Sequence, residues 1–132
     1  MVEFFDAQES SNELNGKKID DGPQLLALLS KLRHRTPFIC ELRGENGFKL
    51  SLGLGEASGF VQFSASDGRA PYWVAVAPGE QDISTEAGEF LIGGTATPIL
   101  RRYCMDSERQ NGIVVHFLRT GQRSPSVIWE EV

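Results

Sequence analysis

The sequence has no uninterrupted apolar run that approaches the roughly 18 residues needed to cross a bilayer. Its first residues, MVEFFDAQES, also carry acids where a secretory signal peptide has a basic start followed by an apolar stretch. We therefore expect a cytoplasmic protein with no membrane partner.

Basic residues are also in short supply. Thirteen Lys and Arg stand against 18 Asp and Glu, which gives a formal net charge of -5. Proteins that hold phosphate backbones through ion pairs carry the opposite sign. Direct binding to nucleic acid is therefore not expected.

Cysteine is too sparse to indicate a metal site. Cys40 and Cys104 lie 64 positions apart, with no CxxC pair and no clustered histidine. This spacing matches neither a zinc site nor a redox motif. We expect two reduced cysteines, with Cys40 in the core, and we expect neither a metal nor another cofactor.

Residues that could carry catalysis are few as well. His34 and His116 are the only histidines, and neither GxSxG nor HExxH is present. Glu130 and Glu131 are not a catalytic pair, because adjacent side chains of a strand point to opposite faces. The sequence thus predicts no enzyme; an enzyme of unrecognised type would have to use His116 or Cys104 with acids brought together by folding.

What the sequence does contain is enough apolar material for one core. Forty per cent of its 132 residues are apolar and 23% are charged, which is typical of a soluble globular protein. The length fits one domain covering residues 1–132. A short strand or arm around Phe4 and Phe5, with a loop at Asn15-Gly16, is expected near the start.

A first helix is predicted from about Asp20 to Arg35. Acids and a proline at Asp20-Asp21-Gly22-Pro23 are typical of a helix start, and Thr36-Pro37 ends the pattern. An apolar stripe at spacings of three and four would face the core. The stripe consists of Leu25, Leu28, Leu29 and Leu32, widened by Leu26.

The middle of the chain predicts an antiparallel meander. Residues 48–54 alternate apolar and polar side chains, and Asn46-Gly47 before them favours a tight turn. The expected strands cover residues 38–43, 48–54, 59–63, 72–76 and 89–92. Thr97-Pro98 argues against a central strand just after the last of these.

A second helix is predicted over residues 106–120, with Asp106 or Ser107 as its cap and Gly121 as its stop. Because Gly112, Val114 and Val115 disfavour a helix, a strand over 112–117 stays open. A C-terminal strand is expected at 127–129. The fold class is therefore α+β: an antiparallel meander with both helices packed on one face.

Acidic residues concentrate between Glu56 and Glu89. The stretch has six acids and one base, Arg69. If these acids share a face, that face would steer a basic partner. The alternative is a solvated surface that keeps the protein soluble.

The ending Arg123-Ser124-Pro125-Ser126-Val127-Ile128-Trp129-Glu130-Glu131-Val132 resembles the C-terminal signature of immunity protein family Imm 1, from bacterial polymorphic toxin systems. Members end in a proline, a spacer, an aliphatic residue, tryptophan and one or two acids. The matching residues here are Pro125, Trp129 and Glu130, with Gly93-Gly94 upstream. The expected order of elements is also similar.

This resemblance implies a protein that binds a toxin and occludes its active site. Toxins paired with the family include nucleic-acid deaminases, and other polymorphic toxins are nucleases, so a cognate toxin domain with a basic cleft is the expected partner. Tryptophan and tyrosine are residue types that often supply binding hot spots, and Tyr72 and Trp73 are flanked by the acidic stretch. We therefore nominate as the partner face Tyr72, Trp73, Glu80, Asp82, Glu86 and Glu89.

Two other kinds of binding protein stay open. A small-ligand or regulatory domain would use a pocket on the meander. That pocket would be lined by Phe48, Leu50, Phe63 and Trp73. A structural assembly subunit is the other alternative, and the oligomeric state is open.

Overall fold

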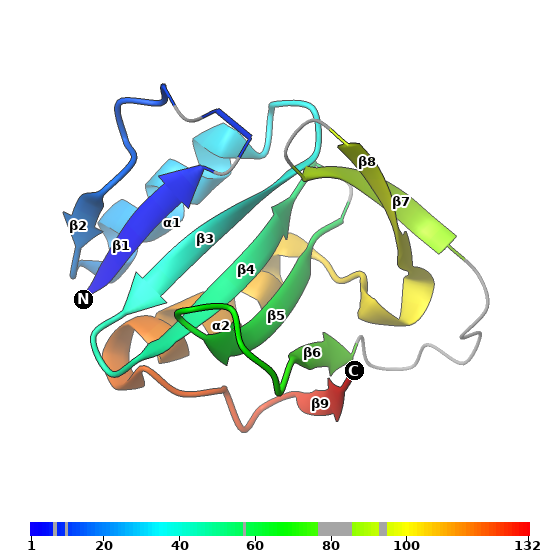
Figure 1. Ribbon diagram of the computed structural model, residues 1–132. Helices are drawn as coiled ribbons and strands as arrows, with labels where there is room; N and C mark the ends of the chain where they lie inside the picture. Colours follow the sequence, from blue (N-terminus) through cyan, green and yellow to red (C-terminus); the bar gives the residue numbers. More distant parts are fainter. Residues whose placement is uncertain (7, 10, 57, 77–85, 93–94) are drawn as a thin grey trace.

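A computed structural model describes residues 1–132 except 7, 10, 57, 77–85 and 93–94 (Figure 1). The strands are β1 (Val2–Asp6), β2 (Lys17–Ile19), β3 (Phe38–Gly44), β4 (Phe48–Leu54), β5 (Phe60–Ala65), β6 (Trp73–Val76), β7 (Glu86–Ile92), β8 (Thr95–Leu100) and β9 (Ile128–Glu131). The helices are α1 (Gly22–Leu32), the short 3-10 helix η1 (Arg101–Tyr103) and α2 (Ser107–Thr120).

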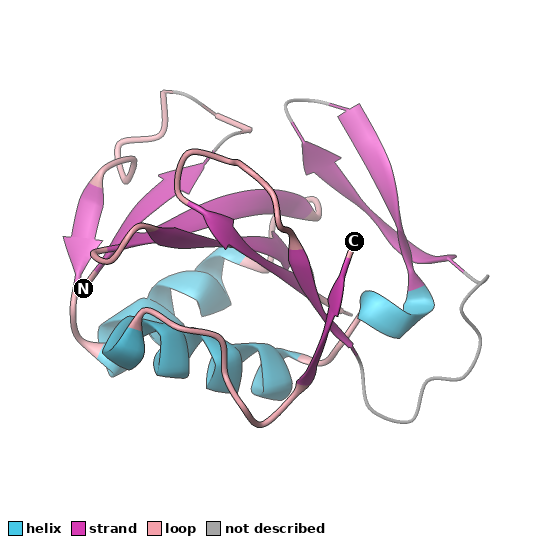
Figure 2. Ribbon diagram, turned by 60° about the horizontal axis from the view of Figure 1, so that its bottom comes forward, coloured by secondary structure: helices cyan, strands magenta, loops and turns pink. Residues whose placement is uncertain are grey.

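The strands form one sheet in the order β2-β1-β3-β4-β5-β6-β9, and β7 joins it beside β3 while pairing with β8. Every pairing is antiparallel except the short parallel contact of β3 with β7. Both α-helices lie on one face of the sheet (Figure 2). The predicted α+β class, with a meander and two helices on one face, is confirmed.

The sheet is covered on both faces, but unequally. The main core lies between the helices and the sheet, where side chains such as Phe4, Leu52 and Phe117 are fully buried. A smaller cluster lies on the other face under the β7–β8 hairpin and η1. It consists of Ile39, Phe60, Val74 and Phe90, flanked by Ile99 and Tyr103.

The helix boundaries follow the capping residues. The Asp21 carboxylate accepts from the backbone N–H of Gln24 at 3.1 Å, and the Asp106 carboxylate accepts from that of Arg109 at 2.9 Å. Gly121 ends α2 in the left-handed region, with a φ of 70°. Residues 112–117 are therefore helical, and the strand alternative is wrong, because the stripe that includes Ile113 and Phe117 buries itself against the sheet.

Two strands differ from expectation. β2 was not predicted, because its three residues pair only with β1 and include just one buried side chain, Ile19. β8 contains Pro98 but pairs only with β7, so the proline stands in an edge strand, where a missing N–H is tolerated. The Gly93-Gly94 prediction lies outside the described residues.

A buried polar network joins the two helices to the sheet. Arg33, directly after the end of α1, is 7% exposed. Its guanidinium donates to Gln110 Oε1 at 2.9 Å and to Asn111 Oδ1 at 2.8 Å. Gln110 Nε2 donates in turn to the carbonyl oxygens of Gly53 at 2.8 Å and Phe60 at 3.2 Å. The network fixes where α1 and α2 sit relative to β4 and β5.

Candidate functional site

The end of the chain forms one margin of the sheet. β9 is the outermost strand and pairs antiparallel with β6, with Ala75 opposite Trp129 and Val74 opposite Glu130. Just beyond the strand, the Val132 N–H donates to the Tyr72 carbonyl at 2.9 Å. The ending is thus an integral part of the sheet.

Trp129 ties this strand to the main core. Its indole ring meets the Phe63 ring edge-on, with centroids 6.3 Å apart and an angle of 65° between the planes. Its Nε1–H donates to the Ser124 carbonyl oxygen at 2.9 Å. The tryptophan therefore holds both β9 and the segment before it against the helix-facing side of the sheet.

Glu130 ties β9 to the other side. Its carboxylate accepts hydrogen bonds from the Arg102 guanidinium and, at 2.9 Å, from the Tyr103 hydroxyl, both in η1. Because Glu131 points to the opposite face and is exposed, the two acids do not converge, as the sequence predicted. Glu130 is a fastening residue of the fold.

Pro125 lies in an exposed turn stabilised by its two neighbours. Ser124 is 4% exposed, and its Oγ lies 2.7 Å from Ser126 Oγ. The Ser126 N–H also donates to Ser124 Oγ at 3.2 Å. The turn directs the chain from the end of α2 towards β9.

The two nominated aromatics are half-buried and engaged by their own chain. The Tyr72 hydroxyl donates to the Gly68 carbonyl at 2.5 Å. Trp73 lies on the helix-facing side, opposite Phe63, and the Arg123 guanidinium covers its ring at 4.2 Å. Both residues flank β9 at the same sheet margin, but neither ring stands free as an anchor.

The nominated acids fall mostly outside what the structure describes. Glu80 and Asp82 lie outside the described residues, and so does the side chain of Glu86, whose backbone begins β7. Glu89 is exposed on β7, opposite Pro98. The acidic partner face over these four residues stays a prediction.

Two further acids of the same stretch lie far apart. Glu56 follows β4 and Asp67 follows β5, so they sit at opposite ends of two antiparallel strands. Glu56 Oε1 is 2.8 Å from His34 Nδ1, and Asp67 Oδ2 is 2.6 Å from Arg69 Nε. These two carboxylates therefore do not join a single acidic face.

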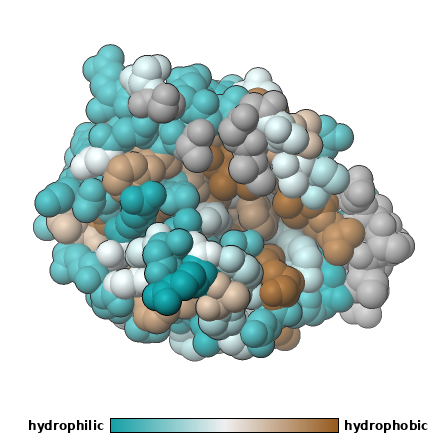
Figure 3. Space-filling view, in the orientation of Figure 1, coloured by the Kyte–Doolittle hydropathy of each residue, from teal (hydrophilic) through white to brown (hydrophobic). Residues whose placement is uncertain are grey.

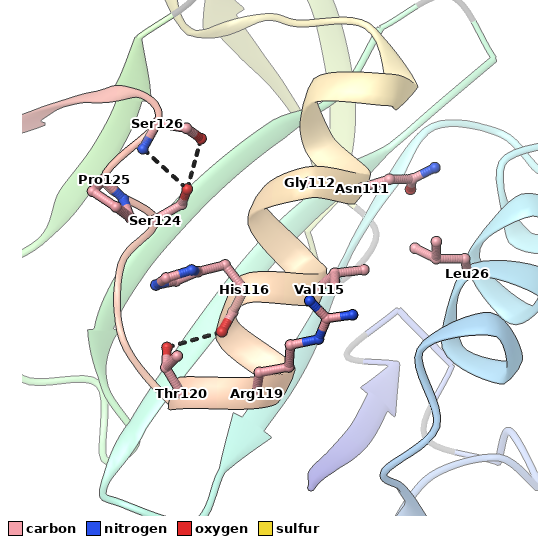
Figure 4. A pocket seen from close by; sticks show the side chains of 10 residues that line it. All are labelled: Leu26, Asn111, Gly112, Val115, His116, Arg119, Thr120, Ser124, Pro125 and Ser126. Carbon is pink, nitrogen blue, oxygen red and sulfur yellow. Dashed lines mark hydrogen bonds between the residues drawn. The ribbon is translucent and has the colours of Figure 1, made fainter.

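A groove of about 560 Å³ follows the outer side of α2 (Figure 4). It runs between α1 and the turn before β9. Its lining residues are Leu26, Asn111, Gly112, Val115, His116, Arg119, Thr120, Ser124, Pro125 and Ser126. A Cβ atom on Gly112 would meet nothing within 4 Å, so the absence of a side chain there widens the groove.

The two residues on which an unrecognised enzyme would depend, His116 and Cys104, lie apart along α2. His116 lines the groove, whereas Cys104 precedes α2, and the nine residue steps from Ser107 to His116 already span roughly 14 Å along the helix. Burial raises the pKa of the Cys104 thiol, which disfavours the nucleophilic thiolate. The geometry does not bring His116 and Cys104 together.

The small-ligand pocket predicted on the meander is wrong. Leu50 is fully buried and Phe63 is 5% exposed. The Phe48 ring stacks on Phe63 with centroids 4.8 Å apart. These side chains, together with Trp73 under Arg123, fill the space that the pocket would need.

Among the described residues, no cluster of three or more His, Cys, Asp or Glu side chains is arranged to hold a metal ion. Nor does the described part of the chain contain a helix with the length and apolar character to cross a membrane.

The outer margin of β9 exposes apolar side chains. Ile128 is 72% exposed and Val132 is 60% exposed, and they are the large hydrophobic residues that the described surface leaves most open. Hydrophobic surface is visible where the C-terminus lies (Figure 3). Sequence reasoning passed over both residues, because alternation in so short a strand does not reveal which of its edges is covered.

No family model matches the chain, and no match was found among curated proteins. The likeness to the immunity family therefore depends on the C-terminal residues and on the order of the elements.

Proposed function

We propose that this chain is an immunity-type protein, which binds a cognate toxin domain and neutralises it by covering the toxin's active site. The toxin acts on nucleic acid, as a deaminase or a nuclease. The protein contributes binding and no chemistry of its own.

One observation carries the proposal: contacts on both faces of the sheet hold β9 in place, yet two apolar side chains, in β9 and directly after it, are exposed. Trp129 and Glu130 fix the strand from opposite sides, while Ile128 and Val132 stay open beside them. Exposed apolar surface on a rigid element is typical of a protein-binding site. The net charge of -5 favours a basic partner, as the cleft of a nucleic-acid enzyme would be.

The residues that carry the C-terminal resemblance have structural roles in this arrangement. Pro125, Trp129 and Glu130 shape and hold the end of the chain. A signature made of such residues identifies a fold and leaves the partner surface free to differ. Tyr72, Trp73 and Glu89 stand as candidates for that surface, together with Glu80, Asp82 and Glu86.

The test is co-expression with the C-terminal domain encoded by the reading frame directly upstream of this gene. We expect that domain to arrest growth alone, to be harmless with this chain present, and to co-purify with it. An empty vector and a fold-disrupting Phe117→Asp variant serve as controls. A toxic upstream domain that this chain neither binds nor neutralises would refute the proposal.

A further inference from the structure

The backbone N–H and C=O groups of β9 point alternately towards β6 and away from the sheet. In an antiparallel pair, hydrogen-bonded and non-hydrogen-bonded residue pairs alternate. The bond from Val132 N–H to the Tyr72 carbonyl makes that pair a bonded one. By alternation, Glu130 and Ile128 also direct their N–H and C=O groups towards β6, in register with Val74 and Val76.

The intervening residues, Trp129 and Glu131, therefore direct their N–H and C=O groups away from the sheet. β9 is the last strand in the sheet order. The alternation excludes a bond from these two amides to β6, and none of the backbone hydrogen bonds outside the strand ladders of the described residues is donated by Trp129 or Glu131. Such a row of unsatisfied groups is a template for another strand.

We propose that the free edge of β9 is the docking site of an extended, basic and aliphatic segment of the partner protein, which adds a strand to the sheet. The inference rests on the proposed function for the identity of the partner, the toxin domain. The pairing itself follows from the geometry of the edge.

The side chains along the edge specify the segment. Ile128 and Val132 point to the η1 side of the sheet and are exposed, so residues opposite them gain by being aliphatic. Glu131 points to the helix side and is exposed, so a lysine or arginine opposite it is favoured. An antiparallel segment would read aliphatic, basic, any, any, aliphatic, from the position opposite Val132 to that opposite Ile128.

The edge is held in place before the partner arrives. Hydrogen bonds join Trp129 to Ser124, Glu130 to Tyr103 and Val132 to Tyr72. The strand therefore has contacts on both faces and at its end. A segment that docks on a fixed edge orders only itself, which lowers the entropic cost of binding.

A second copy of this chain fits the edge less well. An antiparallel pair that used the outward groups of both Trp129 and Glu131 would place Glu130 of one copy opposite Glu130 of the other. Arg102 already pairs with each Glu130, so the larger shortfall is at Glu131, which would lie opposite Trp129 of the other copy and gain no cation. A basic partner has the complementary charge.

The first test uses a synthetic peptide, acetyl-Lys-Val-Lys-Thr-Thr-Val-Lys-amide, and the backbone amide signals of the intact chain by nuclear magnetic resonance. The expected result is saturable shifts of the Trp129 and Glu131 amides at millimolar peptide. Two matched peptides are controls. One has glutamate in place of the second of the three lysines, and the other carries a methyl group on the backbone nitrogen of that lysine and of the second threonine. The N-methylated peptide should bind at least about fivefold more weakly, because two backbone hydrogen bonds are lost.

The second test uses variants and the toxin domain encoded upstream. Glu131→Pro removes an outward N–H but no bond to β6, and we expect the Kd to rise at least about tenfold. Glu131→Gln keeps that N–H and should raise the Kd by up to about fivefold at low salt. Glu131→Lys reverses the charge and should weaken binding more than Glu131→Gln does. Glu13→Lys is its control and should leave the Kd unchanged, because Glu13 is exposed near β2, at the other margin of the sheet.

Three results would overturn the inference: equal binding of the N-methylated peptide, unchanged toxin binding by Glu131→Pro, or protected Trp129 and Glu131 amides in the free monomer. Protection that appears only as a dimer forms would assign the edge to a second copy instead. If the toxin binds but Glu131→Pro has no effect, strand addition fails and the proposed function stands. If the peptide binds as expected but the toxin does not, strand addition at this edge stands and the proposed function fails.

Discussion

Replacing Trp129 with alanine should destabilise the fold and release β9. A fully buried tryptophan costs about 3–5 kcal/mol when truncated to alanine. Trp129 keeps part of its surface exposed, which lowers that figure, but it also loses the Nε1 hydrogen bond to Ser124, worth about 1 kcal/mol. We expect a loss of about 2–4 kcal/mol in the free energy of unfolding.

The assay is urea unfolding followed by far-ultraviolet circular dichroism, with Trp129→Phe as the matched variant. Phenylalanine keeps most of the aromatic contact with Phe63, whose ring lies edge-on to the indole, and removes the N–H donor. It should cost about 1 kcal/mol. A loss below about 0.5 kcal/mol for Trp129→Ala, the usual effect of a surface substitution, would refute the packing described for the C-terminal segment.

Three further predictions concern the scaffold. Gln110→Met should lower the free energy of unfolding by about 2–4 kcal/mol in urea titration, because it leaves the Gly53 and Phe60 carbonyls without their donor; a loss under about 0.5 kcal/mol would contradict the network. Gly112→Ala should raise the free energy of unfolding by about 0.5–1 kcal/mol, since the new methyl group meets no atom within 4 Å and alanine favours a helix. A lower melting temperature would contradict an open position at residue 112. Burial alone raises the pKa of Asp6, but hydrogen bonds from Asn12, Arg35 and two backbone amides outweigh it and hold the pKa below its usual value. The stabilisation supplied by the Asp6 carboxylate is therefore present above about pH 4 and is lost as the pH falls through the lowered pKa. The difference in the free energy of unfolding between wild type and Asp6→Asn, measured by urea unfolding, should be wide at pH 7 and should narrow at pH 3.

The elements that the sequence predicted are those set by local chemistry. The alternation over Phe48–Leu54 fixes a strand, and Asp21, Asp106 and Gly121 fix helix ends, because each signal acts within a few residues. What the sequence did not predict depends on distant partners. Arg33 is buried because Gln110, 77 positions away, accepts its hydrogen bond.

The candidate site shows the same division. The signature residues Pro125, Trp129 and Glu130 drew attention to the C-terminal segment, but no local pattern shows that Glu130 binds Tyr103, 27 positions earlier. Nor does any local pattern tell an edge strand from a central one. The exposure of Ile128 and the outward amide of Glu131 follow from β9 being last in the sheet order, which is a property of the whole topology.

Neighbouring positions at the end of the chain, in β9 and just after it, have different roles. Trp129 and Glu130 are committed to the fold through their side chains, whereas Ile128, Glu131 and Val132 project side chains that the fold does not use. Substitutions at these three positions should have little effect on stability, but they would change the side chains that a docked strand would meet. Under the proposed strand docking, this division would let the partner change through single substitutions that each leave the fold intact.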